Sequence, residues 1–314
     1  MILNKQSQST KFEKELRRVS EEHSLENVFN ASITLLKKDY IYIAFRAVTK
    51  YNPHTIESYL YIRSGSRNKL INLSSEITKY GISKVADPKL FKMGGDDIYI
   101  TFNTGYSKTK NEIFFSKVSY EEISAPVQCN YNERNSVEKN WAFFSHEESL
   151  YAIYSLNPLI ILAADCQCSS VKAPEINFHK VFEQYLEGSP SLSIGTQLLK
   201  TSDNGEYLLL AHKKISLRKK RMYLGVLVKF DFQKLLTNEI SSTITFGENY
   251  IFHSLKSLLG SRKKWNKHLF SCTYFSGLSQ IDDSYILSYG VNDVNFGIKQ
   301  IQQEDAHKNL LLER

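Results

Sequence analysis

Alternation between apolar and polar positions marks most of the chain as strand. Runs such as "DYIYIAFR" (39–46) and "DDIYITFN" (96–103) place aromatic or β-branched residues at every second position, the period of a half-buried strand. Helical spacing of charge pairs occurs in residues 10–26, and the C-terminal "QQEDAHKNLLLER" is similar. Residues 175–187, "EINFHKVFEQYLE", give a third and weaker helical pattern. The pattern therefore predicts an all-β body with short terminal helices.

The strand pattern repeats along the chain. Each copy has a short apolar segment, a polar turn and then an alternating aromatic strand, and a further strand candidate follows it. The turns carry Asp, Asn, Gly or Lys, residues typical of tight hairpins. The five copies are "ITLLKKDYIYIAFR" (33–46), "KLFKMGGDDIYITFN" (89–103), "AFFSHEESLYAIYS" (142–155), "QLLKTSDNGEYLLLAH" (197–212) and "GLSQIDDSYILSYG" (277–290).

Five copies of one hairpin-based unit favour radial repetition, a five-bladed β-propeller. The alternative is a set of unrelated hairpins in a β-sandwich. No Pro-, Gly- or Ser-rich linker divides the chain. We therefore expect an N-terminal helical extension over residues 1–26, one propeller domain over 27–300 and a C-terminal helical tail over 301–314.

The hydropathy of the chain bears on its cellular location. The longest apolar stretch, Leu159 to Ala164, is far shorter than the roughly 20 residues that a bilayer span needs. The N-terminus turns polar after three residues and shows no apolar core of a signal peptide. The expectation is a cytoplasmic protein.

The net charge of +7 is concentrated in "HKKISLRKKR" (212–221) and "SRKKWNKH" (261–268). Such clusters attract phosphates of a nucleotide, a nucleic acid or an anionic lipid, and they also occur as plain solvated faces. Peripheral contact with the inner face of an anionic membrane is one reading. Nucleic acid is not expected, because the clusters lack the interleaved aromatic residues of single-strand binders.

Four cysteines are too few for a disulfide scaffold. Cys166 and Cys168 would share one face of a strand, but further ligands at zinc-like spacing are absent. We expect free thiols, no metal site and no cofactor.

Polar residues recur at one phase of the repeat, just before or after each repeated strand. In a propeller these positions meet at the mouth of the central channel, where each blade contributes one or two groups. Singly, each has an ordinary structural explanation, such as a turn or a strand end. The candidates are Asn30, Ser32, Arg46, Asp87, Lys89, Lys139, Asn140, Gln197, His212, Tyr289, Asn292 and Asp293.

Here the sequence resembles a known family. The motifs "FNASI…DYIYIAFRA", "DPKLF…DDIYITFN", "EKNW…LYAIYSLNP", "GTQLL…EYLLLAH" and "YGVND" are similar to those of the five-bladed β-mannoside phosphorylases and related mannosyltransferases, over roughly residues 27 to 300. The resemblance implies that Asn30 and Arg46 hold the sugar, that Asp87 is the single catalytic aspartate, and that Lys139 is the lysine of the third-blade motif. It matches Tyr289 to Asp293 with a last-blade motif whose aspartate binds sugar hydroxyls.

The chain also departs from that family. Ala31 replaces the proline after the asparagine, Lys89 replaces the arginine of Asp-Pro-Arg, and Val291-Asn292 replaces two alanines. The longer phosphate-binding set of arginine and histidine is not clearly matched. The motifs therefore support phosphorolysis less strongly than they support sugar binding.

The residue chemistry agrees with a sugar site. Amides and carboxylates hydrogen-bond hydroxyls, and Trp141, Tyr154 or Tyr289 would supply a stacking face. Sugar binding is assigned to Asn30, Ser32, Arg46, Asn140, Gln197, Tyr289, Asn292 and Asp293, and donor or phosphate binding to Lys139, His212 and Lys89.

An inverting transferase or phosphorylase needs one protein carboxylate, because the acceptor hydroxyl or phosphate is the nucleophile, and Asp87 fits that role. The leading hypothesis is a glycosyltransferase that uses a sugar nucleotide or sugar phosphate and a glycan acceptor, as in surface polysaccharide synthesis. The alternatives are an inverting glycoside phosphorylase and a non-catalytic propeller that binds glycan or protein. A hydrolase needs a second carboxylate, for which Asp165 and Glu138 are candidates.

Overall fold

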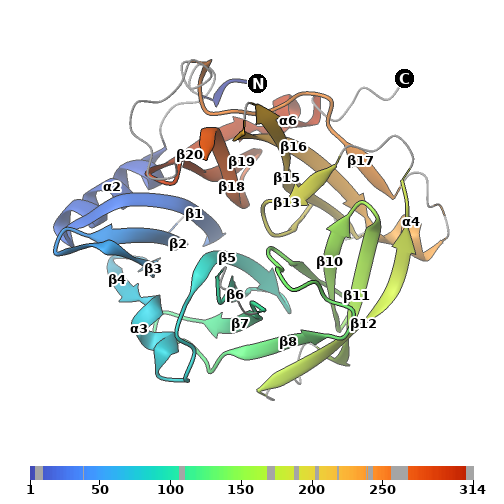
Figure 1. Ribbon diagram of the computed structural model, residues 1–314, viewed down its shortest axis with the longest axis horizontal. Helices are drawn as coiled ribbons and strands as arrows, with labels where there is room; N and C mark the ends of the chain where they lie inside the picture. The colour runs from blue at the N-terminus through green and yellow to red at the C-terminus, as the bar shows by residue number, and fades with distance from the viewer. Residues whose placement is uncertain are drawn as a thin grey trace.

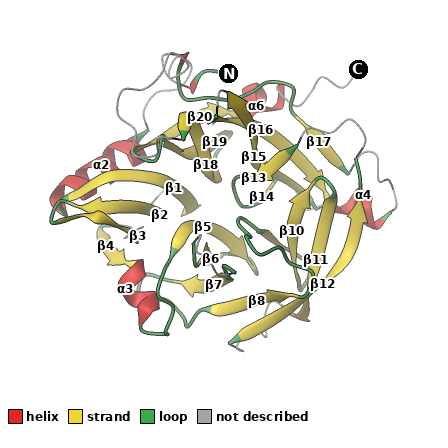
Figure 2. Cartoon of the chain, in the orientation of Figure 1, coloured by secondary structure: helices red, strands yellow, loops and turns green. Residues whose placement is uncertain are grey.

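A computed structural model describes the chain except for residues 4–9, 38, 106–109, 168–173, 187–190, 202–204, 218, 238, 240–242, 256–267 and 309–314. Its described residues are mostly strand, arranged in groups around a common centre (Figure 1). The short helices lie on the outside of these groups (Figure 2). The all-β prediction is confirmed, and the arrangement is propeller-type.

The described strands form three hydrogen-bonded sheets. The first holds β1 (Leu25–Lys37), β2 (Tyr40–Thr49), β3 (Asn52–Ser64) and β4 (Arg67–Asn72) in that order. The second joins β5 (Ala86–Met93), β6 (Asp97–Asn103), β7 (Ile113–Val118) and β8 (Val127–Tyr131) to β9 (Ala142–His146), β10 (Ser149–Leu156), β11 (Leu159–Gln167) and β12 (Glu175–Gln184). The third contains β13 (Leu192–Ile194), β14 (Leu199–Lys200), β15 (Glu206–Leu217), β16 (Lys220–Asp231), β17 (Ile244–Phe246), β18 (Leu269–Ile281), β19 (Ser284–Val291) and β20 (Asn295–Gln302).

Parallel pairing joins antiparallel groups within the two larger sheets. β8 pairs with β12, and β16 pairs with the start of β18, while every other named pair is antiparallel. Because the pairing merges groups into three sheets, the number of blades stays a prediction.

All of the repeated sequence units form antiparallel hairpins. The units at 33–46 and 89–103 are the β1–β2 and β5–β6 hairpins, and the later units form the hairpins β9–β10, β14–β15 and β18–β19. The strand candidates that follow lie in β3, β7, β11, β16 and β20. Period-two patterning with turn residues therefore located the hairpins correctly.

The core lies between neighbouring strand groups. Each cluster of buried residues draws on two adjacent groups, and the cluster around β1–β3 includes Ile286 and Ile298 from β19 and β20. The first and last groups therefore pack together. At the centre, β1 contacts β5 and β18, and β5 also contacts β9.

The helices in the described part of the chain are α2 (Lys11–Glu22), α3 (Leu73–Thr78), α4 (Phe232–Leu236) and α6 (Gln303–Lys308). α2 confirms the predicted N-terminal helix. Its N-cap Thr10 accepts a hydrogen bond from the Glu13 amide at 3.2 Å and donates one to the Ile298 carbonyl at 3.0 Å. α6 confirms the start of the C-terminal helix, whose last residues lie outside the described part of the chain.

The helix expected at 175–187 is wrong, because residues Glu175–Gln184 form the strand β12. Ile176 and Phe178 are buried at alternate positions, and β12 pairs with both β11 and β8. The Glu, His and Lys residues of this segment favoured a helix locally. The backbone pairing of β12 with β8 and β11 overrides that preference.

Candidate functional site

Several of the predicted site residues share an unusual backbone conformation. Asn30, Asp87, Asn140, Asn292 and Asp293 have φ values of 52°, 48°, 65°, 54° and 58°. This left-handed region is costly for most side chains and is reached most readily by Asn, Asp and Gly. Pairing shifts register between Phe29 and Ser32 and between Ala86 and Lys89, so bulges flank the first two positions. A bulge re-aims a side chain out of the strand alternation.

A cavity of about 1070 Å³ opens beside Asn30, Asp87, Asn140 and Asp293. Half of the predicted site residues line it, and they come from strand groups far apart in the sequence: Asn30, Arg46, Asp87, Lys139, Asn140 and Asp293. The structure therefore brings the first, second, third and last repeats to one place.

The Asp87 carboxylate lines this cavity. Its Oδ1 accepts a hydrogen bond from Arg46 at 3.0 Å and a long one from the Asn30 amide at 3.4 Å. The Lys139 ammonium stands 3.8 Å from Oδ2. The Asp87 side chain is only 9% exposed, so these partners replace most of its hydration.

Electrostatics keep Asp87 ionised. Burial alone would raise the pKa of its carboxyl, but the charges of Arg46, Lys139 and Lys89 together outweigh burial and lower that pKa below its ordinary value. At neutral pH Asp87 is therefore a carboxylate that can accept a proton.

Gly290 makes room for Asn30. A Cβ on residue 290 would stand 2.1 Å from Asn30 Oδ1 and 2.8 Å from the Asn30 backbone nitrogen. The close neighbour of Gly290 is therefore the asparagine that contacts Asp87.

Gly290→Ala should lower the free energy of unfolding by about 1–3 kcal/mol, because the added methyl group overlaps Asn30. It should also displace the Asn30 amide from the Asp87 carboxylate. Denaturant unfolding and a crystal structure of the variant measure the two effects. Combining it with Asn30→Gly removes the side-chain overlap and should restore part of the lost stability; an unchanged defect would contradict this account.

Four of the predicted sugar-binding residues do not line the cavity but lie in the interior. Ser32 Oγ accepts from the Leu90 amide at 3.0 Å, and Asn292 Oδ1 accepts from the Cys272 amide at 2.8 Å. Gln197 joins two strand groups through the Phe143 amide and the Trp141 carbonyl. Tyr289 is 2% exposed and packs against Phe275 and beneath Gly297.

Two predicted phosphate ligands, Lys89 and His212, are also buried, each 1% exposed. His212 stacks on Tyr274 with ring centroids 4.4 Å apart. Burial, reinforced by the charge of Lys89, lowers the pKa of His212 to about 3, so the imidazole is neutral at physiological pH. Neither residue reaches the cavity lining.

Sequence reasoning missed part of the lining. The Tyr274 hydroxyl donates to Asn140 Oδ1 at 3.2 Å. Lys214 and Arg221 add positive charge from β15 and β16; the basic run 212–221 was the signal for them, but it gave no residue assignment. Most of the second basic run, 261–267, lies outside the described residues. Other lining residues include Phe29, Ile56, Val137, Tyr223 and Leu269.

The aromatic faces also differ from expectation. Trp141 is 1% exposed and packs among Tyr131, Tyr154 and Phe178. Tyr154 donates to Glu138 at 2.6 Å. Neither lines the cavity, where Tyr223, Tyr274 and Phe29 stand instead.

The two candidates for a second catalytic carboxylate lie elsewhere. Asp165 is 54% exposed and pairs with His179 at 2.7 Å. Glu138 is buried against Tyr154, and burial raises the pKa of its carboxyl. Among described lining residues, the carboxylates are Asp87 and Asp293.

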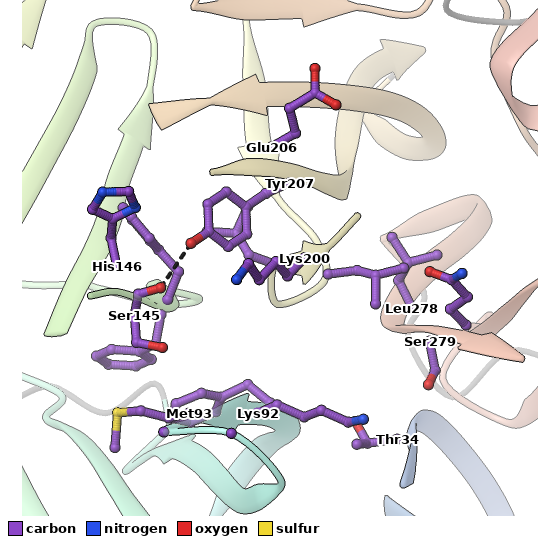
Figure 3. A pocket seen from close by; sticks show the side chains of 18 of the residues that line it. Thr34, Lys92, Met93, Ser145, His146, Lys200, Glu206, Tyr207, Leu278 and Ser279 are labelled. Atoms are coloured by element: carbon purple, nitrogen blue, oxygen red, sulfur yellow. Dashed lines mark hydrogen bonds between the residues drawn. The ribbon is translucent and has the colours of Figure 1, made fainter. Parts of the chain in front are cut away.

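A second cavity, about 1690 Å³, opens at the opposite ends of β1, β5 and β18, beside Thr34, Met93 and Ser279. Figure 3 shows its side chains, with the Tyr207 hydroxyl bonded to the Ser145 carbonyl at 2.8 Å. It is the larger of the two, but its Tyr207 and Ser145 groups bond each other and none of the predicted site residues lines it. We therefore place the candidate site at the smaller cavity.

Among the comparisons with known proteins, the one with solved structures supports the fold. No protein-family model and no curated protein matches the sequence. Solved structures do match, at low sequence identity.

A protein of the GH130 family of mannoside phosphorylases, which contains glycoside hydrolases that target β-1,2-mannosidic linkages in Candida mannan, gives a TM-score of 0.61 at 12% identity over 89% of this chain and 85% of that chain. The β-1,2-mannobiose phosphorylase from Listeria innocua gives 0.57 at 12% identity over 92% and 93%. A GDP-Man-dependent mannosyltransferase from Leishmania mexicana gives 0.53 at 12% identity over 89% and 86%. The chain thus shares the fold of these proteins across nearly its whole length.

Among the described helices, none has both the length and the apolar character required to cross a bilayer.

Proposed function

We propose that the protein is a carbohydrate-active enzyme that transfers a glycosyl group with inversion, and that its mannoside-processing structural neighbours indicate the substrate class. One observation carries this proposal: a largely buried carboxylate, Asp87, lines a basic cavity and is held ionised by Arg46 and Lys139.

The cavity has the charge that a phosphorylated donor needs. Its cations come from three strand groups and exceed its carboxylates among the described lining residues: Arg46, Lys139, Lys214 and Arg221 against Asp87 and Asp293. Guanidinium and ammonium groups bind phosphate oxygens through charge-assisted hydrogen bonds. Asn30, Asn140 and Asp293 supply the amide and carboxylate groups that sugar hydroxyls bond.

In the transfer reaction, an acceptor hydroxyl attacks the anomeric carbon of the donor. The bond between that carbon and the phosphate oxygen breaks, and the nucleoside diphosphate leaves with the electron pair. Asp87 takes the proton from the attacking hydroxyl. Because the nucleophile belongs to the acceptor, one protein carboxylate is sufficient.

The ionised state of Asp87 favours transfer over phosphorolysis. In phosphorolysis, phosphate attacks the anomeric carbon and the leaving oxygen must receive a proton, so Asp87 would have to start protonated. Its lowered pKa opposes this in the ligand-free protein. Phosphorolysis remains the second candidate, because a phosphate beside Lys139 and Arg46 would offset their charges and raise the proton affinity of Asp87.

The test is a product assay with a panel of nucleotide sugars, GDP-mannose included, and mannose or mannobiose acceptors. We expect acceptor-dependent release of nucleoside diphosphate and a new glycoside of inverted configuration by NMR. Phosphate-dependent release of a sugar 1-phosphate from mannobiose would instead establish the phosphorylase. If sugars bind but neither reaction occurs, the protein is a glycan-binding module and the proposal fails.

A further inference from the structure

Two polar residues of the loop 132–141, between β8 and β9, line the cavity: Lys139 and Asn140. The Lys139 ammonium stands 3.8 Å from Asp87 Oδ2, and Asn140 has a left-handed φ of 65°. Because this loop lies outside the sheets, its buried peptide groups need partners other than a neighbouring strand. The source of those partners decides where Lys139 and Asn140 stand.

Asn111, which lies just before β7, bonds the loop with both ends of its side-chain amide. Its Oδ1 accepts a hydrogen bond from the Glu138 amide at 2.8 Å, and its Nδ2 donates one to the Glu138 carbonyl. The Asn111 backbone also donates to the Ser136 carbonyl at 3.4 Å. Asn111 is 1% exposed and does not line the cavity. The peptide groups on both sides of Glu138 are therefore fixed directly before Lys139.

The Tyr154 hydroxyl on β10 ties the same loop. It donates to Glu138 Oε1 at 2.6 Å and accepts from the backbone and side-chain amides of Asn135, both at 3.0 Å. These bonds use its one proton and both of its lone pairs. The Tyr154 ring also packs against Trp141, with centroids 5.7 Å apart. Tyr154 therefore links three positions of the loop from outside the cavity lining.

We infer that Asn111 and Tyr154 are positioning residues that set Lys139 and Asn140 in the cavity. Both hold Glu138, the residue before Lys139: Asn111 bonds its backbone, and Tyr154 bonds its carboxylate. A lysine has a long flexible stem, so fixing the adjacent backbone narrows the region that its ammonium reaches. Loss of either set of bonds loosens the two cavity groups without removing them.

The place of Lys139 matters for Asp87. Burial raises the pKa of the Asp87 carboxyl, and the charges of Arg46, Lys139 and Lys89 lower it. A Lys139 ammonium displaced from its position 3.8 Å away would lower that pKa less. The inference rests on the proposed function only where Lys139 binds a donor phosphate, because its placement beside Asp87 exists without any substrate.

The experiment follows the Asp87 carboxyl by ¹³C NMR of protein labelled at aspartate, with the resonance assigned by its loss in Asp87→Asn. Tyr154→Phe removes the hydroxyl and keeps the ring, and it should move the acid midpoint of Asp87 to higher pH. Asn111→Ala, which removes both amide bonds, should do the same. Lys139→Met should also raise the midpoint, and adding Tyr154→Phe to it should cause no further shift, because the ammonium that the loop places is gone.

Tyr207→Phe is the matched control, because it removes another hydroxyl of a buried tyrosine, one that bonds the Ser145 carbonyl at the other cavity. It should leave the Asp87 midpoint unchanged. A wild-type midpoint in Tyr154→Phe, or an equal shift with and without the Lys139 ammonium, would overturn the inference and leave Tyr154 a structural residue.

The transfer assay separates this inference from the proposed function. Tyr154→Phe should raise KM for the phosphorylated donor roughly 10-fold, the loss expected for one hydrogen bond to a charged group, with a smaller change in kcat. A raised Asp87 midpoint with an unchanged donor KM would confirm the positioning of the loop and remove Lys139 from donor binding. Because the NMR readout needs no turnover, its failure is distinct from failure of the proposed glycosyl transfer.

Discussion

Asp87→Asn should lower kcat of glycosyl transfer by about 10²- to 10⁴-fold, the usual contribution of a positioned general base. The amide has nearly the same shape and can still accept from Arg46, but it cannot take the acceptor's proton. The KM for a phosphorylated donor should stay unchanged or fall, because Arg46, Lys139 and Lys89 lose the anion that offsets them. Steady-state kinetics with separate variation of donor and acceptor measures this split.

Two further variants make the result specific. Asp165→Asn alters an exposed aspartate outside the cavity and should leave kcat and KM at wild-type values. Asp293→Asn alters the other cavity carboxylate and should raise KM for the sugar more than it lowers kcat, if that residue binds hydroxyls. Wild-type turnover in Asp87→Asn would remove the catalytic assignment, and a large kcat loss confined to Asp293→Asn would transfer it to Asp293.

The sequence predicted the hairpins because their signal is local. Alternation and turn residues lie within about 15 residues of each other, as in 89–103, and both survive in the fold. The order of the strand groups followed from the repeat. The merging of groups by parallel pairs was not predictable, because β8 and β12 are joined by backbone bonds that leave no residue pattern.

The site was predictable in part, for a related reason. Recurrence at one phase of the repeat brought Asn30, Asp87 and Asp293 together correctly, since equivalent positions meet at one end of the fold. It could not tell a cavity residue from its buried neighbour. Bulges at Phe29/Ser32 and Ala86/Lys89, with left-handed residues between, decide which side chains turn outward. Ser32 and Lys89 therefore lie within the fold although their sequence neighbours line the cavity.

The buried polar residues among the predicted site residues bond the backbone instead of lining the cavity. Gln197 bonds the backbone on both sides of Ala142, and Asn292 bonds the backbone of β18. Buried peptide groups need hydrogen-bond partners, and these amides supply them near the starts of β9 and β18. In the sequence these residues looked like sugar ligands, because amide side chains hydrogen-bond hydroxyl groups and peptide groups equally well.

Arg46→Met should lower the free energy of unfolding at neutral pH by about 3 kcal/mol, the lower end of the cost of breaking a buried ion pair. The Arg46 and Asp87 side chains are 15% and 9% exposed, so water replaces little of the lost contact. Lys139 and Lys89 remain to offset the carboxylate, which keeps the cost from rising further. Without Arg46, burial is less opposed and the pKa of Asp87 rises.

The pH dependence of this defect follows from the same shift. In the wild type the lowered pKa of Asp87 stabilises the fold above its unfolded value of 3.8, and this contribution is lost as the pH falls through the folded value. In Arg46→Met the Asp87 carboxylate lacks its guanidinium partner, so its charge destabilises the fold and protonation removes that destabilisation. The difference in stability between the two proteins should therefore be largest near pH 7 and shrink as the pH approaches 4, as urea unfolding at a series of pH values would show.

A double-mutant cycle isolates the pair from the other contact of Arg46, its guanidinium 5.3 Å from the ring centroid of Phe29. In an Asp87→Asn background, Arg46→Met should cost much less than in the wild type, because no buried charge is left unpaired. Arg18→Met removes a surface pair with Glu22, 57% and 50% exposed, and should change stability by less than about 1 kcal/mol. Equal costs of Arg46→Met in both backgrounds would mean that Arg46 stabilises the fold through packing on Phe29 and that the charge of Asp87 is held by the lysines alone.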